Sequence, residues 1–166
     1  MDPNHTFPSF EINHLGFSTQ RGRFNKTSGK ITLDTTKKTG SIDVAIEVAS
    51  LSTGLDKLEE HLRGSDFFDA EKFPTITFKS NKLSFKEANL VKADGNFTLH
   101  GVTKPITLKI SHFKCGMHPI YKKQVCGADV STTIKRSDFG ISQFLPMVSD
   151  EVNLLIQVEA IKDGST

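Results

Sequence analysis

The sequence predicts an all-β protein with about eight antiparallel strands and one short helix. Apolar residues recur at every second position in segment after segment, as in strands with one dry face and one wet face. The stretches between these segments are short and rich in turn residues, which favours antiparallel neighbours. Few helices are available to cover a sheet, so the dry faces must meet one another, in a sandwich or in a closed barrel.

The predicted strands follow one another from the N-terminus. In residues 10–15, Phe10 and Ile12 alternate with polar neighbours. In residues 42–48, the apolar side chains share one face while Asp43 and Glu47 lie on the other. No linker or low-complexity tract interrupts the series, so we expect a single domain over residues 1–166. Further strands are expected at residues 23–33, 76–78, 83–85, 90–100, 106–110, 130–134 and 152–158.

One segment breaks this two-residue rhythm. Leucines recur at helical spacing within residues 55–62, and Thr53 with Asp56 forms a capping-box pattern ahead of them. The sequence therefore predicts one short helix over about residues 54–63.

Length and charge narrow the possible classes of function. A chain of 166 residues buries roughly two-thirds of the surface that it exposes when unfolded, so its core needs no metal. The chain has 21 Lys and Arg against 19 Asp and Glu, and the positive charges are scattered rather than gathered in a block. We therefore expect no nucleic-acid partner. No apolar run approaches the roughly 20 residues that a membrane-spanning helix needs.

The aromatic composition is lopsided, with 13 Phe, one Tyr and no Trp. Phenyl rings have no polar group, so they need apolar surroundings or an apolar ligand. On residue statistics alone, ordinary packing at the ends of the barrel explains them, and a barrel of about eight strands can be filled or can hold one small ligand. Periodicity does not decide between these alternatives. The rings in loop-like or strand-end positions are Phe17, Phe24, Phe67, Phe68, Phe73, Phe139 and Phe144.

The two cysteines, Cys115 and Cys126, lie close in sequence with a turn predicted at residues 116–119. Across a hairpin they could form a disulfide, which would stabilise the fold by about 3 kcal/mol and would imply an oxidising compartment. Zinc is an alternative, but Cys115, His118 and Cys126 are one ligand short of a tetrahedral site. Two unpaired thiols in a reducing cell are the third alternative.

The usual motifs of catalysis are missing from the sequence. The histidines show no His-Glu-x-x-His or close His-x-His spacing, and there is no Gly-x-Ser-x-Gly elbow or glycine-rich phosphate loop. His14 shares a predicted face with Phe10 and Ile12, where a hydrogen-bonded core histidine is the simpler interpretation. Asp56 and Glu59 lie on the surface of the predicted helix. No motif therefore demands an enzyme, and we expect no catalytic residues and no metal.

The N-terminus lacks the basic stretch and apolar core of a secretory signal. Either the protein is cytosolic, or an export signal has been removed and Met1 was supplied during expression. The two cysteines bear on this choice, because disulfides persist in oxidising compartments.

Several stretches of the chain carry a further signal. In their order and spacing they resemble the bacterial YceI-like family along nearly the whole length, and such a series is far more specific than a single short pattern. The stretches are residues 2–6 (Asp-Pro-Asn-His-Thr), 10–18 (Phe-Glu-Ile-Asn-His-Leu-Gly-Phe-Ser), 61–69 (His-Leu-Arg-Gly-Ser-Asp-Phe-Phe-Asp), 73–78 (Phe-Pro-Thr-Ile-Thr-Phe), 99–105 (Leu-His-Gly-Val-Thr-Lys-Pro) and 136–140 (Arg-Ser-Asp-Phe-Gly).

This resemblance implies a lipocalin-like barrel with an elongated apolar cavity that binds an isoprenoid chain, such as a polyprenyl phosphate or a quinone, or another amphiphilic lipid. It also implies export to the periplasm, a homodimer and transient contact with a membrane. Family members with a Cys-Gly-x-His-Pro segment followed by Cys-Gly resemble residues 115–119 and 126–127 here, which supports a disulfide. The bound lipid is the only ligand expected, and no other cofactor is.

The resemblance also suggests candidate site residues. His14, Arg63 and Arg136 lie within the matching stretches and can donate hydrogen bonds to a phosphate or quinone head. Two alternatives to a lipid carrier remain: a lipid-modifying enzyme that uses His14 inside a dry barrel, and a structural or metal-binding protein whose barrel is filled. The predicted cavity lining is Phe10, Ile12, Phe17, Phe24, Phe67, Phe68, Phe73, Phe78, Phe97, Phe139, Ile141 and Phe144.

Overall fold

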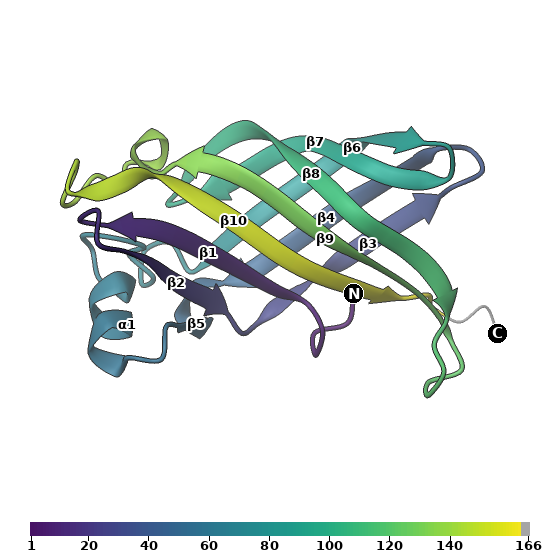
Figure 1. Ribbon diagram of the computed structural model, residues 1–166, viewed down its shortest axis with the longest axis horizontal. Coiled ribbons are helices and arrows are strands. Elements are labelled where there is room, and N and C mark those ends of the chain that lie inside the picture. Colours follow the sequence, from purple (N-terminus) through teal and green to yellow (C-terminus); the bar gives the residue numbers. More distant parts are fainter. Residues whose placement is uncertain (164–166) are drawn as a thin grey trace.

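The computed structural model describes residues 1–163 as one strongly curled antiparallel sheet with a single α-helix at one end (Figure 1). The helix is α1 (Asp56–Arg63), and two short 3-10 turns, η1 (Val48–Ser50) and η2 (Arg136–Phe139), follow β4 and β9. The strands are β1 (Phe7–His14), β2 (Ser18–Phe24), β3 (Thr27–Asp34), β4 (Thr39–Glu47), β5 (Leu51–Ser52), β6 (Thr75–Lys86), β7 (Asn89–Leu99), β8 (Val102–Met117), β9 (Gln124–Lys135) and β10 (Val148–Ile161).

The two ends of the chain meet in the middle of the sheet. The strand order is β3-β4-β6-β7-β8-β9-β10-β1-β2-β5, so the last strand pairs with the first. Phe7 of β1 lies opposite Gln157 of β10, and His14 lies opposite Val148. This pairing curls the meander into a barrel, and the alternating apolar side chains of its strands turn toward the interior.

The barrel is not closed by a continuous ladder of hydrogen bonds. β2 and β3 are consecutive in the chain but do not pair with each other, and we call the gap between them the seam. At the corner between them, the Asn25 N–H donates to the Ser50 carbonyl over 3.0 Å, and β5 adds two residue pairs to β2. The helix α1 lies at the β5 end of the seam (Figure 1).

The predicted antiparallel, lipocalin-like β fold with one helix is confirmed, but the sheet has ten strands instead of about eight. The predicted strand at residues 23–33 is two strands, because the backbone at Asn25 bonds to Ser50 instead of extending a ladder. Conversely, residues 76–78 and 83–85 belong to one strand, β6. A bulge between Lys79 and Lys82 interrupts its pairing with β7.

The helix begins two residues later than predicted, and its cap differs from the predicted capping box. The N-cap residue is Leu55, whose side chain makes no capping hydrogen bond. Instead, the Glu59 carboxylate accepts hydrogen bonds from the Thr53 and Gly54 N–H groups, at 2.6 and 3.1 Å. These bonds lower the pKa of Glu59 and fix the helix to the segment after β5. No helix among residues 1–163 is long and apolar enough to cross a membrane.

Cys115 and Cys126 form a disulfide between β8 and β9, where they lie directly opposite each other. Neither sulfur is therefore a thiolate, so the zinc alternative with His118 and the free-thiol alternative both fail. The disulfide is consistent with an oxidising compartment.

Candidate functional site: an apolar cavity in the barrel

The interior of the barrel contains two cavities that share a wall. The larger has a volume of about 480 Å³ and lies at the α1 end, and the smaller has about 120 Å³ and lies toward the chain termini. Together they form an elongated apolar space along the barrel, so the barrel is not filled with side chains. The residues that line both cavities are Pro8, Ile46, Phe97, Leu154 and Ile156.

Aromatic rings form one wall of the larger cavity. The rings of Phe10, Phe24 and Phe68 lie with their centroids 5.5 to 6.2 Å apart, in tilted and edge-to-face arrangements. Phe10 can turn inward because its partner on β2 is Gly22, and a side chain on Gly22 would collide with its ring. The β1–β2 pairing, the loop after α1 and the absence of a side chain at Gly22 thus build this wall together.

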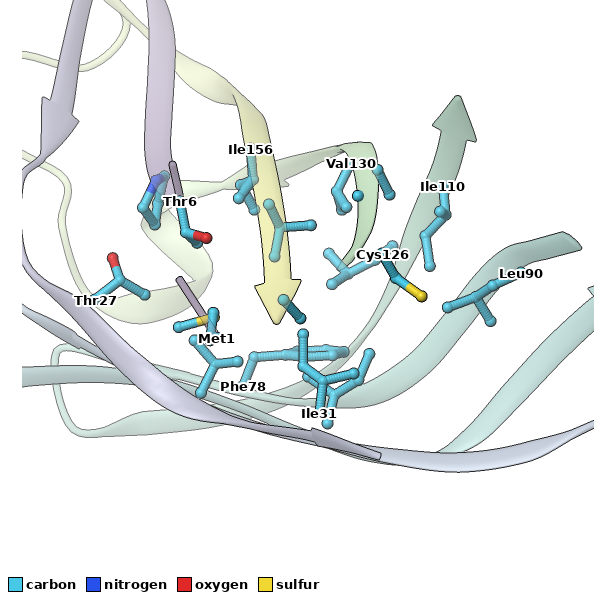
Figure 2. A pocket seen from close by; sticks show the side chains of 18 of the residues that line it. Met1, Thr6, Thr27, Ile31, Phe78, Leu90, Ile110, Cys126, Val130 and Ile156 are labelled. Carbon is cyan, nitrogen blue, oxygen red and sulfur yellow. The ribbon is translucent and has the colours of Figure 1, made fainter. Parts of the chain in front are cut away.

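The smaller cavity is lined mainly by aliphatic side chains and by Phe78, Phe97 and Phe113, contributed by strands that face each other across the barrel (Figure 2). Ile31 and Phe78 lie below it in this view, and Val130 and Ile156 lie above. Thr27 also lines it. The Thr27 hydroxyl is buried and has no hydrogen-bond partner among the described residues.

The larger cavity has a mouth where its lining residues reach solvent. The exposed lining residues come from β1, β2, α1 and the loop before β10, and they are His14, Gln20, Arg21, His61 and Phe144. The larger cavity therefore has exposed polar residues in its lining at the mouth. The lining of the smaller cavity is apolar apart from two threonines.

Arg136 lies beside the mouth and, among residues 1–163, is the one charged residue that is both buried and part of the lining. It is 4% exposed, and its guanidinium donates to the carbonyls of Ser149, Ile141 and Val148 at 2.9, 3.1 and 3.0 Å. Burial lowers the pKa of Arg136, and the nearby charge of Asp150 opposes that change. The group stays protonated at neutral pH, so a positive charge lies at the cavity wall with only neutral acceptors in direct contact.

Asp150 binds the residue that follows Arg136. Its carboxylate accepts hydrogen bonds from the Ser137 N–H at 2.9 Å and from the Ser137 hydroxyl at 2.7 Å. These two bonds hold the pKa of Asp150 below its ordinary value, with a smaller contribution from Arg136. Asp150 therefore ties η2 to β10 and keeps Arg136 in position.

Most of the aromatic and aliphatic residues predicted to line a cavity do so. Three predicted residues do not. Phe17 is 88% exposed at the β1–β2 turn, Phe73 packs on His100 with centroids 4.6 Å apart, and Phe139 is fully buried against Phe97 outside both cavities. The predicted residues that line a cavity are Phe10, Ile12, Phe24, Phe67, Phe68, Phe78, Phe97, Ile141 and Phe144.

The three head-group candidates are separated by the structure. His14 and Arg136 both line the larger cavity near its mouth. Arg63 does not line a cavity, because it donates to the Leu51 carbonyl at 3.3 Å and lies 3.9 Å from the Glu59 carboxylate. Arg63 therefore links α1 to β5.

Sequence reasoning did not identify several residues of the lining, although their apolar pattern is visible in the sequence. Leu58 and Leu62 of α1 line the larger cavity, but an apolar helix face looks the same whether it meets a core or a cavity. The aliphatic residues of β4 and β10 were identified as inward-facing, for example Ile46 and Leu154. Alternation predicts an inner face but does not predict that it leaves space.

The chain is similar to known proteins in both sequence and fold. The YceI-like domain model matches residues 1–160. A UPF0312 protein of Pseudomonas aeruginosa is 41% identical over 163 residues, which cover 95% of this chain and 82% of that protein. The crystal structure of the Campylobacter jejuni YCEI protein has a TM-score of 0.78 and 33% identity, and the match covers 92% of this chain and 91% of the other.

A third likeness concerns the fold alone. The structure of a polyisoprenoid binding domain from Saccharophagus degradans, implicated in plant cell wall breakdown, matches with a TM-score of 0.70 and 16% identity. The match covers 95% of this chain and 94% of that domain. The curled sheet is therefore shared across sequences that have diverged widely.

Proposed function

This chain belongs to the YceI-like domain family, and we propose that it binds and carries a long-chain isoprenoid, or a similar amphiphilic lipid, inside the barrel. The observation that carries the proposal is the elongated apolar space of two adjoining cavities with a mouth at one end. The polyisoprenoid binding domain with the same fold supports the isoprenoid class of ligand.

The physical basis of such binding is the removal of an apolar tail from water. Each buried CH₂ group contributes about 0.8 kcal/mol before the costs of ordering are subtracted, so a long tail needs no specific polar contact. In our proposal the tail extends past Phe97 and Leu154 toward Phe78, and the head stays at the mouth.

Arg136 is our candidate for the contact with the head. Its three hydrogen bonds to carbonyls use three of the five guanidinium N–H groups, which leaves donors for a phosphate or quinone oxygen. His14, exposed at the mouth, is a second candidate donor. Either a polyprenyl phosphate or a quinone satisfies this arrangement.

The titratable groups favour binding over catalysis. Arg136 is the buried titratable group in the described lining of the larger cavity, and a guanidinium is a poor general acid or base at neutral pH. His14, the residue proposed for an enzyme, is exposed at the mouth instead of buried in the barrel. We therefore propose a binding protein, located in the periplasm as the disulfide favours.

Native mass spectrometry of the purified protein, followed by chloroform extraction of the bound molecule, tests the proposal. We expect an isoprenoid lipid in near-equal proportion to protein. A protein that stays free of lipid after incubation with a polyprenyl phosphate and with a quinone would contradict it. The same spectra report the mass of the assembly, and we propose a homodimer.

Leu154→Trp tests whether both cavities hold one tail. Leu154 lines both cavities, so an indole there would close the passage between them and reduce retention of long-chain lipid by tenfold or more. The matched control is Leu155→Trp, because the neighbouring Leu155 is 42% exposed on the outer face and should leave retention unchanged. Equal retention by both variants, at equal thermal stability, would contradict a continuous tail site.

A further inference from the structure

The hairpin tip between β8 and β9 exposes three large apolar side chains. We define the β8–β9 tip as residues 114–126. Within it, Met117 is 60% exposed, Ile120 78% and Tyr121 43%. The tip extends beyond the barrel at the end opposite α1 (Figure 1). The lipid cavity does not use these three side chains, because none of them lines it.

The charged side chains within the same tip are all positive. Lys114, Lys122 and Lys123 are exposed there, and residues 95–128 contain no Asp or Glu. The first carboxylate after the tip, Asp129, lies 3.1 Å from His112, and Glu159 of β10 lies opposite Gly127. A further lysine, Lys162, is tethered beside the tip by its N–H bond to the Gln124 carbonyl, and Asp163 follows it.

The tip is held in one conformation by several bonds. The Cys115–Cys126 disulfide closes its base, and the His118 N–H donates to the Lys123 carbonyl at 2.8 Å. His118 Nδ1 accepts from the N–H groups of Ile120 and Tyr121 at 3.2 and 3.1 Å, and the two rings of His118 and Tyr121 stack with centroids 4.2 Å apart. A partner would therefore meet preformed apolar side chains, which lowers the entropic cost of docking.

We propose that the β8–β9 tip docks on the surface of a lipid bilayer that contains anionic lipid. Ile120, Met117 and Tyr121 would enter the interfacial region, where Tyr is favoured, and the lysines would lie against anionic head groups. Each lysine near such a surface strengthens binding by roughly fivefold. Charge of one sign around an apolar apex fits a bilayer of the opposite sign better than it fits a neutral protein surface.

This docking fixes the orientation of the molecule. The tip and the mouth lie at opposite ends of the long axis, so the mouth of the larger cavity would point away from the bilayer (Figure 1). The inference does not depend on the proposed cargo, because the tip is complete with or without a lipid in the barrel.

Co-sedimentation with vesicles tests the proposal, using phosphatidylcholine alone and phosphatidylcholine with about one quarter phosphatidylglycerol. We expect at least tenfold tighter binding to the anionic vesicles, and loss of most of it at about 0.5 M NaCl, where charges are screened. Ile120→Ser and the pair Lys114→Glu with Lys123→Glu should each weaken binding tenfold or more. These side chains are exposed, so the variants should fold, as circular dichroism will check.

Phe17→Ser is the matched control, because Phe17 is exposed in the turn between β1 and β2, and this turn lies at the α1 end of the barrel (Figure 1). It should bind as the unaltered protein does. Loss of binding in Phe17→Ser overturns the proposal, since the mouth would then contact the bilayer, and so does equal binding to both vesicles. No binding to either vesicle also overturns it and leaves the tip for a protein partner or a second copy of this chain.

Discussion

Arg136 lines the larger cavity and Thr27 lines the smaller one, and the two residues differ in how their polar groups are paired. Arg136 has three carbonyl acceptors, so its burial is compensated by hydrogen bonds. The Thr27 hydroxyl has no partner among residues 1–163 although the residue is buried. A buried hydroxyl without a partner costs about 1 to 3 kcal/mol. Position 27 is therefore one where a polar group weakens the fold.

Thr27→Val should stabilise the protein by about 1 kcal/mol, because Val fills the same volume without a hydroxyl to desolvate. The free energy of unfolding in urea measures the change. Thr27→Ser is the control, since it keeps the hydroxyl and should not stabilise. A Val variant less stable than the unaltered protein would mean that the hydroxyl is satisfied in solution.

At the scale of elements, local contacts hold strands and turns where the sheet alone would not. The Glu59 carboxylate fixes α1 to the segment after β5, Asp150 fixes η2 to β10, and the disulfide closes the β8–β9 hairpin. The first two links each join an irregular segment to its neighbour, and the disulfide joins two paired strands. Their energies can therefore be tested one at a time.

Asp150→Asn should cost stability in a way that depends on pH. The pKa of Asp150 is lowered in the folded state, so its contribution is complete above its ordinary pKa of 3.8 and is lost as the pH falls through the lowered value. We expect a loss of about 1 kcal/mol at pH 7 and a smaller one near pH 2, from urea unfolding at both values. An equal loss at both pH values would contradict this account.

Reduction of the Cys115–Cys126 disulfide should destabilise the protein by about 3 kcal/mol, because the unfolded chain regains the entropy of a short closed loop. Urea unfolding with and without reductant measures this change. The Cys115→Ala, Cys126→Ala double variant is the control, and it should be indifferent to reductant. An equal free energy of unfolding for the oxidised and the reduced protein would contradict this account.

At the scale of the whole molecule, the inner and outer faces of most strands could be predicted, and the boundaries of the cavity could not. Alternation identified the inward residues of β4 and β10, since period two follows directly from strand geometry. Phe17, which the excess of Phe in loop-like positions suggested as lining, lies outside both cavities, because Leu15 and Gly16 both have positive φ and turn the chain outward after β1. Phe139, suggested on the same ground, lies instead in the packed core beside Phe97, where η2 directs it.

Arg63 shows the limit of a motif. Its place in a stretch shared with the family suggested a head-group contact, but only the three-dimensional arrangement shows that it lies outside both cavities and donates to the Leu51 carbonyl. The volume of the interior is equally invisible in the sequence, because a filled barrel and a hollow one have the same alternation.

The seam between β2 and β3 makes the barrel wall elastic. Strands on its two sides can separate slightly without breaking a ladder of hydrogen bonds, because no ladder joins them. The amides of the free edge of β3 should accordingly exchange with deuterium sooner than those of β9, which is paired on both sides. If the barrel binds the lipid that we propose, a wall that can widen at the seam would accept tails of different thickness. The molecules extracted from this protein are therefore expected to form a series of homologues instead of a single compound.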